Sequence, residues 1–386
     1  MSQPLVSIIT PSYNQAQFIE ATIESVLGQT YPNIEYIVMD GGSKDATVDI
    51  LRRYDGRLTW VSERDRGQAD AVNKGFARAR GEIVAWLNSD DVYYPEAVAH
   101  AVTYLSEHPE VDMVYGDGDI IDAEGRVVKR FANTEPYDLW RLVHVWDYIM
   151  QPATFFRRSA WEQAGGLDID LHWCLDWDLW IKMGLKAPIA YLPEVLACSR
   201  EYEATKTSTG GWKRLREIRN VMGRYTDVKY PPGFWLYGAS TVLTEAGEGS
   251  WKHRLLVPPA GFVIGRTLRT VPGRFPDGWV GPRAHFWLCP AFGGSRTVAV
   301  EGMVHAFPGL LPLKVELWAD GRRQAAWEVT AGGPVRFTAE LPPGVSAKAP
   351  VALELRTSSN FVPSRTGGGD TRRLSLQVHS VTWAQR

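Results

Sequence analysis

The sequence predicts an α/β fold with a mostly parallel sheet, followed by a small β-sandwich. In the first part of the chain, short apolar runs rich in β-branched residues alternate with segments of helical spacing. Such alternation produces a parallel sheet with helices on both faces. After residue 295, strand-like runs follow one another with turns between them, which is typical of an antiparallel sandwich. The 386 residues, 45% of them hydrophobic, are enough for two such units.

The first elements form a β-α-β unit. Two apolar runs, at residues 5–10 and 34–40, flank a segment from 16 to 29 whose apolar side chains recur at helical spacing. The alternation favours parallel neighbours in one sheet. It continues with a helix ending near Tyr54, a strand at 58–62, a helix at 68–79 and a strand at 82–87.

Polar clusters follow three of these strands. They occupy residues 11–14, 40–43 and 88–91. Because ligands bind at the carboxyl ends of the strands in open α/β sheets, we expect the three clusters to converge on one cleft.

The composition of the chain changes near Tyr230. A stretch rich in Pro, Gly and Trp, without clear periodicity, runs over 231–294 and is interpreted as a connecting region. It divides the chain into an α/β domain over 1–230 and a β-domain over 295–386. The strand-like runs of the second domain are 297–304, 313–318, 325–329, 335–341, 351–357 and 374–381.

Composition excludes several classes of protein. The 42 Lys and Arg nearly balance the 44 Asp and Glu without a basic block, so we expect no nucleic-acid partner. The first residues lack the features of a secretory leader, which predicts a cytoplasmic protein. No uncharged apolar run approaches the roughly 18 residues of a membrane span. Any membrane contact would therefore be peripheral. The three cysteines are widely separated in the sequence, and we expect them to be reduced.

Two adjacent carboxylates, Asp90 and Asp91, stand between an apolar strand and a helix expected to begin near Pro95. Mg²⁺ and Mn²⁺ prefer oxygen ligands, and they often take one or two protein carboxylates together with substrate phosphates. An isolated pair of this kind is more often a helix cap. The context of the pair decides between the two interpretations.

That context consists of three separated stretches: TPSYNQAQFIEATIESVLGQTYPNIEYIVMDGGSKDAT, GQADAVNKGFARARGEIVAWLNSDDVY and QPATFFRRSAWEQAGGLDIDLHWCLDWDLWIKMG. With these stretches in this order, the chain resembles the inverting family 2 glycosyltransferases with the GT-A fold. The resemblance covers residues 5 to about 208. It implies that residues 1–230 are a GT-A catalytic domain that takes its sugar from a nucleotide-diphosphate donor.

The resemblance assigns the nucleoside pocket to the polar clusters after the first two strands. It implies that Pro11, Tyr13 and Asn14 line this pocket and that Asp40 contacts the base or the ribose. The glycines after Asp40 lack the spacing of a phosphate-binding loop, so we expect them to permit a sharp turn.

The resemblance assigns the sugar and the diphosphate to the following segments. It implies that Asp70 and Lys74 lie near the donor sugar or diphosphate, that Asp90 holds the ribose or sugar, and that Asp91 ligates Mn²⁺ or Mg²⁺. This chain has Ser-Asp-Asp where some members have Asp-x-Asp, so a share of the metal for Asp90 stays open.

Asp176, in the stretch LDWDLW at the expected beginning of a helix, matches the catalytic base of the family. An inverting transfer needs a carboxylate that takes the proton of the acceptor hydroxyl as that hydroxyl attacks the sugar. Alone, the acidic first turn would be explained by the helix dipole. Beside the upstream motifs, we predict Asp176 as the base and Asp178 as structural.

The stretch after this helix corresponds to a loop that often closes over the diphosphate in the family. Arg200 and Lys206 lie in this loop-like segment and would neutralise charge on the leaving group. An ordinary solvated loop is an equally good interpretation. On the acceptor side, Trp173 is the one tryptophan that we expect to contact a sugar ring.

The predicted function is inverting transfer of a sugar, with UDP-sugars the expected donors, to a hydroxyl of a glycan or lipid-linked acceptor in surface polysaccharide assembly. The end of the β-domain, NFVPSRTGGGDTRRLSLQV, resembles a domain appended to some bacterial polysaccharide glycosyltransferases. This second resemblance implies self-association into a homo-oligomer, docking to a partner enzyme, or retention of a long glycan. The expected location is the cytoplasm, with the inner face of the membrane as an alternative.

Two other functions remain open at this point. A sugar nucleotidylyltransferase also uses an α/β sheet with metal-binding aspartates, but such enzymes carry a Gly-rich activating loop that TPSYNQAQF lacks. A carbohydrate-binding protein that kept the fold without turnover is the second alternative. The presence of Asp40, Asp91 and Asp176 together argues against it.

Overall fold

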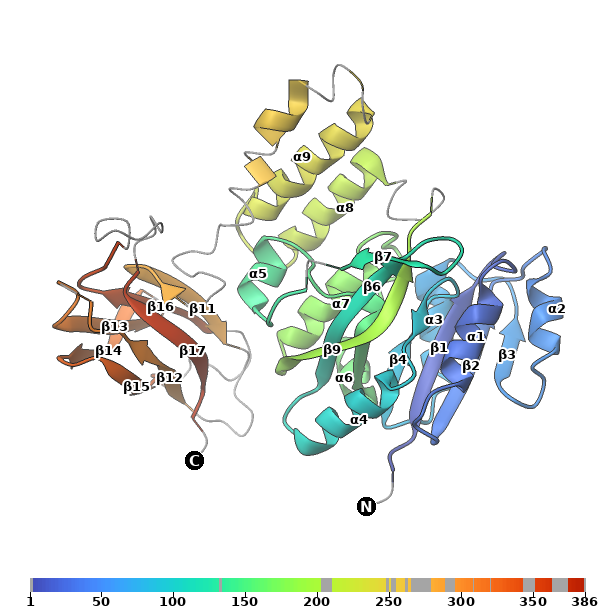
Figure 1. The fold of residues 1–386 in the computed structure, drawn as a ribbon, viewed down its shortest axis with the longest axis horizontal. Helices are drawn as coiled ribbons and strands as arrows, with labels where there is room; N and C mark the ends of the chain where they lie inside the picture. Colours follow the sequence, from blue (N-terminus) through green and yellow to red (C-terminus); the bar gives the residue numbers. More distant parts are fainter. Residues whose placement is uncertain are drawn as a thin grey trace.

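The structure is a computed structural model. It describes residues 3–131, 134–202, 210–247, 250, 255–260, 263–264, 279–288, 296–307, 309–319, 321–342, 351–362 and 374–384. An α/β unit, a pair of helices and a β-unit follow one another along the chain, as the colours of Figure 1 show.

The first half of the α/β unit follows the expected alternation of strands and helices. Its strands β1, β2, β3 and β4 all run parallel, because a helix separates each strand from the next. The elements are β1 (Val6–Ser12), α1 (Ile19–Leu27), β2 (Ile34–Asp40), α2 (Thr47–Arg52), β3 (Thr59–Ser62), α3 (Gln68–Phe76) and β4 (Ile83–Trp86).

The second half extends the same sheet with strands of both directions. Its elements are β5 (Val92–Tyr93), α4 (Ala97–Glu107), β6 (Met113–Ile121), β7 (Val127–Arg130), α5 (Leu139–His144), the 3-10 turn η1 (Gln151–Ala153), β8 (Thr154–Arg157), α6 (Arg158–Ala164), α7 (Leu175–Gly184) and β9 (Ile189–Arg200). The strand order is β3-β2-β1-β4-β8-β6-β9-β5, with β7 beside β6. β8 is antiparallel to both neighbours, whereas β6 and β9 pair in parallel. The expected α/β fold is confirmed.

Two apolar cores cover the two faces of this sheet. Successive side chains of a strand point to opposite faces, so Ile9 of β1 belongs to one core and Ile8 to the other. β4 divides in the same way, with Trp86 on the first face and Ala85 on the second. Both faces of the sheet are therefore covered at the central strands β1 and β4, all of whose residues are buried.

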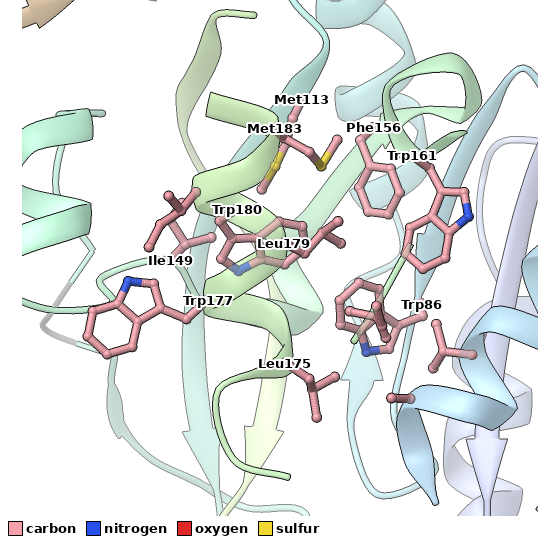
Figure 2. Close-up of a cluster of buried hydrophobic side chains, with 14 of the residues drawn as sticks. Trp86, Met113, Ile149, Phe156, Trp161, Leu175, Trp177, Leu179, Trp180 and Met183 are labelled. Carbon is pink, nitrogen blue, oxygen red and sulfur yellow. The ribbon is translucent and has the colours of Figure 1, made fainter. Parts of the chain in front are cut away.

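The core on the side of α7 is rich in aromatic rings. Figure 2 shows Trp180 of α7 beside Trp86 of β4, with Phe156 and Trp161 next to them. The Trp86 and Trp180 rings stack with their centroids 5.4 Å apart, and both side chains are fully buried. α7 is thereby fixed against the sheet at a point close to the carboxyl end of β4.

Two long helices, α8 (Gly211–Gly223) and α9 (Pro232–Ala246), follow the sheet and lie side by side at the top of Figure 1. Ile218, Val221 and Met222 of α8 are buried and join the core on the side of α7. The expected connecting region thus begins with a regular helix. Among the described residues, no helix is both long enough and apolar enough to cross a membrane.

The β-unit consists of two four-stranded antiparallel sheets that share one apolar core, so it is a sandwich as expected. One sheet has the order β10-β17-β12-β15 and the other β11-β16-β13-β14. The strands are β10 (Trp279–Val280), β11 (Arg283–Leu288), β12 (Thr297–Val304), β13 (Leu313–Ala319), β14 (Arg322–Val329), β15 (Gly333–Glu340), β16 (Val351–Thr357) and β17 (Leu376–Trp383).

The boundary expected at residue 295 falls inside this β-unit. β10 pairs with β17, and β11 pairs with β16 along its whole length. The described part of the unit therefore begins at Trp279. The sequence left these two strands in the connecting region because they are short and follow a stretch without periodicity.

Candidate active site

A cleft of about 1350 Å³ opens at the carboxyl ends of β1 and β4. Its lining combines residues that are far apart in the sequence: Pro11, Ser12, Tyr13, Gly41, Asn88, Asp90, Asp91, Asp147, Gln151, Trp173, Asp176, Arg200, Arg214 and Tyr237. The three polar clusters expected to converge each contribute to this cleft, as the position of ligands in open α/β sheets predicts.

The turn after β4 presents the adjacent carboxylates. Asp91 is almost fully buried, and its two oxygens accept hydrogen bonds from the backbone N–H of Arg200 (3.0 Å) and from the amide of Asn88 (3.0 Å). Asp90 accepts a hydrogen bond from the hydroxyl of Tyr202 (3.0 Å). Both carboxylates are therefore held in place from outside their own turn.

Burial makes the ionisation of these two carboxyl groups unfavourable. Loss of water contact, followed by the neighbouring Asp90 carboxylate, raises the pKa of Asp91 to about 7. Burial likewise raises the pKa of Asp90 above its ordinary value. Two carboxylates that resist ionisation in this way are stabilised when a cation arrives between or beside them.

The two carboxylates suit a hard divalent cation that has further oxygen ligands outside the protein. Asp90 and Asp91 offer oxygen atoms, which Mg²⁺ and Mn²⁺ prefer. Within the described parts of the chain, no group of three or more His, Cys, Asp or Glu side chains is placed to hold a metal. The pair therefore fits a cation that completes its coordination with substrate and water oxygens.

Asp40 lies under the loop that follows β2. Its carboxylate accepts hydrogen bonds from the backbone N–H groups of Gly42 (3.1 Å) and Ser43 (2.9 Å) and from the hydroxyls of Ser43 and Ser62. Gly42 has a φ of +82°, which favours glycine. Asp40 thus shapes the 41–43 loop, and Gly41 of that loop lines the cleft.

Asn14 connects the loop after β1 to the same region. Its side-chain oxygen accepts a hydrogen bond from Lys44 N–H (2.8 Å), and its own N–H donates to the hydroxyl of Ser43 (2.7 Å). Pro11 and Tyr13 line the cleft itself, and Tyr13 is 55% exposed. The first two strand ends therefore form one connected wall.

Asp70 and Lys74 of α3 lie outside the cleft lining. Asp70 pairs with Lys74 (3.2 Å) and accepts a hydrogen bond from Arg66 N–H (3.1 Å), while Lys74 also pairs with Glu63 (3.3 Å). These contacts brace the loop between β3 and α3. Arg64 of that loop lines the cleft, and Lys74 donates a hydrogen bond to its carbonyl (3.4 Å), so the predicted pair contacts the cleft wall from behind.

Asp176 is the first acidic residue of α7 and faces the cleft. The segment just before α7 is held by Glu217 of α8, whose carboxylate accepts the N–H groups of Trp173 (2.6 Å) and Cys174 (2.8 Å). Trp173 also lines the cleft, beside Asp176. Glu217 thereby fixes the segment that carries Trp173 and leads into α7, the helix that presents Asp176.

Asp178 is turned away from the cleft and is fully buried. It forms ion pairs with Lys182 (2.7 Å) and Arg224 (3.0 Å) and accepts a hydrogen bond from the hydroxyl of Tyr225 (2.6 Å). These contacts connect α7 to the end of α8. The structural role expected for Asp178 agrees with this arrangement.

Arg200 differs from the expectation of a mobile loop residue. It is the last residue of β9 and is buried, because β9 continues its pairing with β6 as far as this position. Its guanidinium donates to the backbone carbonyls of Asp90 (2.8 Å) and Asp122 (2.8 Å) and lies over the Phe18 ring. Arg200 thus supports the carboxylate turn. Lys206 lies outside the described residues.

Comparisons with known proteins give the chain a family. Residues 7–163 match the family Glycosyl transferase family 2. An uncharacterized glycosyltransferase of Mycobacterium tuberculosis is 34% identical over 239 residues, which cover 60% of this chain and 87% of that protein. The chain belongs to glycosyl transferase family 2. It is therefore a glycosyltransferase.

Other relatives and structures are similar over part of the chain. An uncharacterized glycosyltransferase of Rickettsia typhi is 32% identical over 217 residues, 53% of this chain and 67% of that protein. Residues 1–349 of Staphylococcus aureus TarS in complex with UDP-GlcNAc give a TM-score of 0.48 at 18% identity, covering 70% of this chain and 82% of that one. Mannosyltransferase PcManGT from Pyrobaculum calidifontis, in complex with GDP-Man and Mn²⁺, gives 0.49 at 22% identity, covering 69% and 85%.

The cleft of this glycosyltransferase contains residues that the sequence did not indicate. Asp147 lies before η1, and loss of water contact together with the nearby Asp176 raises its pKa well above the ordinary value. Gln151 accepts a hydrogen bond from Asn88 (2.8 Å), which itself donates to Asp91. Arg214 and Tyr237 enter from α8 and α9. Of these four residues, Gln151 could have been found, because it begins the stretch QPATFF of the family resemblance. Asp147, Arg214 and Tyr237 come from segments without a motif.

Proposed function

We propose that this glycosyltransferase transfers a sugar, with inversion, from a UDP-sugar to a hydroxyl of a glycan or lipid-linked acceptor in surface polysaccharide assembly. The observation that carries the proposal is the position of Asp176: it faces the same cleft as the buried pair Asp90 and Asp91. A candidate base and a candidate site for the diphosphate thus stand on two walls of one cleft.

The wall formed by the first two strand ends is the proposed nucleoside site. Pro11 and Tyr13 provide apolar and aromatic surface for a base, while Asn14 and Asp40 hold the loops around it. Asp70 and Lys74 keep the neighbouring loop, with Arg64, at the edge of the cleft.

The carboxylate turn is the proposed diphosphate site. Asp91, with Asp90 beside it, would hold Mn²⁺ or Mg²⁺, and the cation supplies charge stabilisation for the leaving diphosphate. Arg200 keeps the turn in place through the carbonyl of Asp90. Lys206, in the following segment, is the proposed cation that closes on the phosphates.

Asp176 is the proposed general base. It would accept the proton of the acceptor hydroxyl while that oxygen forms the new bond to the anomeric carbon and the bond to the diphosphate breaks. Trp173 offers an aromatic face to the acceptor sugar on the same side. Asp147, whose pKa is raised by loss of water contact and by Asp176, would hold an acceptor hydroxyl as a neutral donor.

The experiment combines donor binding and turnover. Thermal stabilisation and donor hydrolysis are measured with UDP-, GDP- and dTDP-sugars in Mn²⁺, Mg²⁺ or EDTA, on wild type, Asp91→Ala and Asp176→Asn. We expect one nucleotide class to stabilise the wild type only with metal, and Asp91→Ala to lose that stabilisation. Asp176→Asn should bind the donor like wild type and lose turnover by about a hundredfold or more.

The exposed Asp170, six residues before Asp176, supplies a matched control. Asp170→Asn removes one carboxylate near α7 without touching the cleft lining and should leave both measurements unchanged. If no nucleotide sugar binds the wild type under any condition, the proposed function is wrong. Loss of donor binding in Asp176→Asn would contradict the role of this residue as the base.

The proposed location follows from the acceptor. Donors of this class are made in the cytoplasm, and lipid-linked acceptors are assembled on a membrane, so we place the protein in the cytoplasm at the inner face of the cell membrane. Fractionation of cells that produce the full chain tests this. Recovery only from an exported fraction would contradict it.

A further inference from the structure

The helix pair α8 and α9 carries an apolar groove on its outward face. The groove has a volume of about 380 Å³, and its lining consists of apolar side chains and glycine, with the helical turns at 255–260 as its third wall. Trp212 and Leu215 come from α8, Trp235 and Val242 from α9, and Leu256 from the third wall. The groove is separate from the active-site cleft.

Large side chains at this groove are open to solvent. Trp212 and Trp235 are each 55% exposed, and Leu255 beside the groove is 66% exposed. The tryptophans of the α/β core, such as Trp86 and Trp180, are by contrast fully buried. A contiguous exposed apolar surface of this kind marks a binding surface.

Cations lie beside the groove, on α8 and at Tyr230, whose ring contacts the groove residues Phe234 and Trp235. Trp212, Arg216 and Arg219 stand at positions i, i+4 and i+7 of α8, so they share one stripe of that helix, and both arginines are exposed. Arg219 and Lys229 lie over the Tyr230 ring at 5.3 and 5.5 Å. The rim of the groove is therefore aromatic and positive.

The acidic residues of the same segment are fewer than its cations. Residues 210–247 contain six Lys and Arg but three Asp and Glu, although the whole chain has a net charge of −2. Glu217 is turned inward to the N–H groups before α7, and Glu245 lies against Gly211 at the start of α8. Two of the six cations serve other places, because Arg224 pairs with Asp168 and Asp178 and Arg214 lines the cleft. The four others, Lys213, Arg216, Arg219 and Lys229, stand beside one exposed acidic residue, Asp227, so this face keeps an excess of positive charge.

We propose that the outward face of α8 and α9, with the turns at 255–260, docks onto the surface of an anionic lipid membrane. Tryptophan and tyrosine favour the boundary between headgroups and acyl chains, and the apolar groove would enter that boundary. Lysine and arginine at the rim attract anionic headgroups. A second copy of this face would instead oppose arginine to arginine across a symmetric interface, which disfavours self-association here.

The same helices contribute to the active site from their inner faces. Arg214 of α8 and Tyr237 of α9 line the cleft, and the Tyr237 hydroxyl accepts a hydrogen bond from Asp147 N–H (3.2 Å). Docking would therefore bring the acceptor side of the cleft close to the membrane. This deepens the proposed function, on whose lipid-linked acceptor it rests, but the docking is measured without any turnover.

Co-sedimentation of the full chain with vesicles tests the proposal. One set of vesicles contains phosphatidylcholine alone, and in the other phosphatidylglycerol replaces a third of it. We expect binding to the anionic vesicles, weakened by salt. Arg216→Gln with Arg219→Gln should weaken binding by about fivefold for each cation removed, or roughly 25-fold for the pair. Trp212→Ser with Trp235→Ser, with both arginines kept, should abolish most of the affinity for the anionic vesicles.

Two exposed arginines of the β-unit, Arg322 and Arg336, provide the charge control. Arg322→Gln with Arg336→Gln should bind the anionic vesicles like wild type. Each variant must keep the melting temperature and the donor-dependent stabilisation of the wild type, because none of these residues belongs to the cleft lining. A variant that loses vesicle binding but keeps donor-dependent stabilisation shows a failure of docking alone, and not of the proposed function.

Three outcomes would overturn the proposal. The wild type could ignore both kinds of vesicle, or it could bind both equally with no effect of the α8 and α9 variants. Alternatively, it could sediment as a dimer without vesicles and become a monomer in Trp212→Ser with Trp235→Ser. In that last case a second copy of the chain covers the groove.

Discussion

At the scale of single residues, we expect the buried pair Asp90 and Asp91 to make the stability of the protein depend on pH when divalent cations are removed. The pKa of Asp91 is about 7 in the folded chain, where burial comes first among the causes, against 3.8 as its ordinary value. Between these values the folded state binds more protons than the unfolded state. Stability therefore falls as pH rises through this window, and the loss is complete above the folded pKa.

Asp91→Asn removes the buried carboxyl group whose ionisation lowers the stability. In EDTA, the melting temperature of Asp91→Asn relative to wild type should increase between about pH 4 and about pH 8, because only the wild type must ionise a buried carboxyl. Scanning calorimetry across this range measures the difference. Asp170→Asn, at an exposed position, should show no such trend. A difference that shrinks with rising pH would contradict the raised pKa of Asp91.

At the same scale, we propose Glu217 as a positioning residue for Asp176, the proposed base. Its carboxylate accepts the N–H groups before α7, so Glu217→Ala leaves those groups unpaired and frees the start of the helix. We expect kcat to fall by up to about a hundredfold, since small displacements of a base are costly. The donor Kd should stay unchanged, and Glu217→Gln, which keeps an acceptor oxygen, should restore most of kcat. An equal loss of donor affinity would argue against positioning.

At the scale of elements, the close approach of α3 to the sheet depends on a glycine. A Cβ added at Gly75 would lie 2.3 Å from Cγ2 of Ile9 in β1. Gly75→Ala should therefore lower the free energy of unfolding by about 1–3 kcal/mol. Gly223 of α8 has nothing within 4 Å of its added Cβ, so Gly223→Ala should be neutral or stabilise by up to about 1 kcal/mol. Urea denaturation compares the two, and equal effects would contradict the packing explanation.

The alternating elements of the first half could be predicted because each strand and helix has its own local pattern. The position of Arg200 could not, because the length of β9 depends on its pairing with β6, whose partner residues lie about eighty positions earlier in the chain. Asp147 and Glu217 were missed for a similar reason. Their partners, Tyr237 and the backbone before α7, are supplied by the tertiary fold.

At the scale of the whole molecule, the described lining of the cleft ends at Tyr237, before the β-unit begins. A chain that stops at residue 278 should therefore keep donor-dependent stabilisation and donor hydrolysis within about twofold of the full chain. A chain that stops at residue 294 keeps β10 and β11 without their partner strands and should aggregate. Loss of donor binding in the shorter chain would show that the β-unit supports the cleft.

The role proposed for the β-unit is an interaction or the retention of a long glycan. With the chain that stops at residue 278, transfer to long glycan acceptors should fall relative to short ones, or the oligomeric mass should fall. Activity assays on both acceptors and sedimentation measure this. Unchanged values for short acceptors, long acceptors and mass together would exclude the proposed role.

The hydrogen bond from Arg200 N–H to Asp91 connects residues that are 109 positions apart. During translation, the carboxylate turn therefore emerges from the ribosome long before the strand that completes it. A nascent chain that ends before β9 lacks both the N–H group that fixes Asp91 and the guanidinium that holds the carbonyl of Asp90. The proposed cation site is thus completed late in synthesis, when almost all of the α/β unit has already been made.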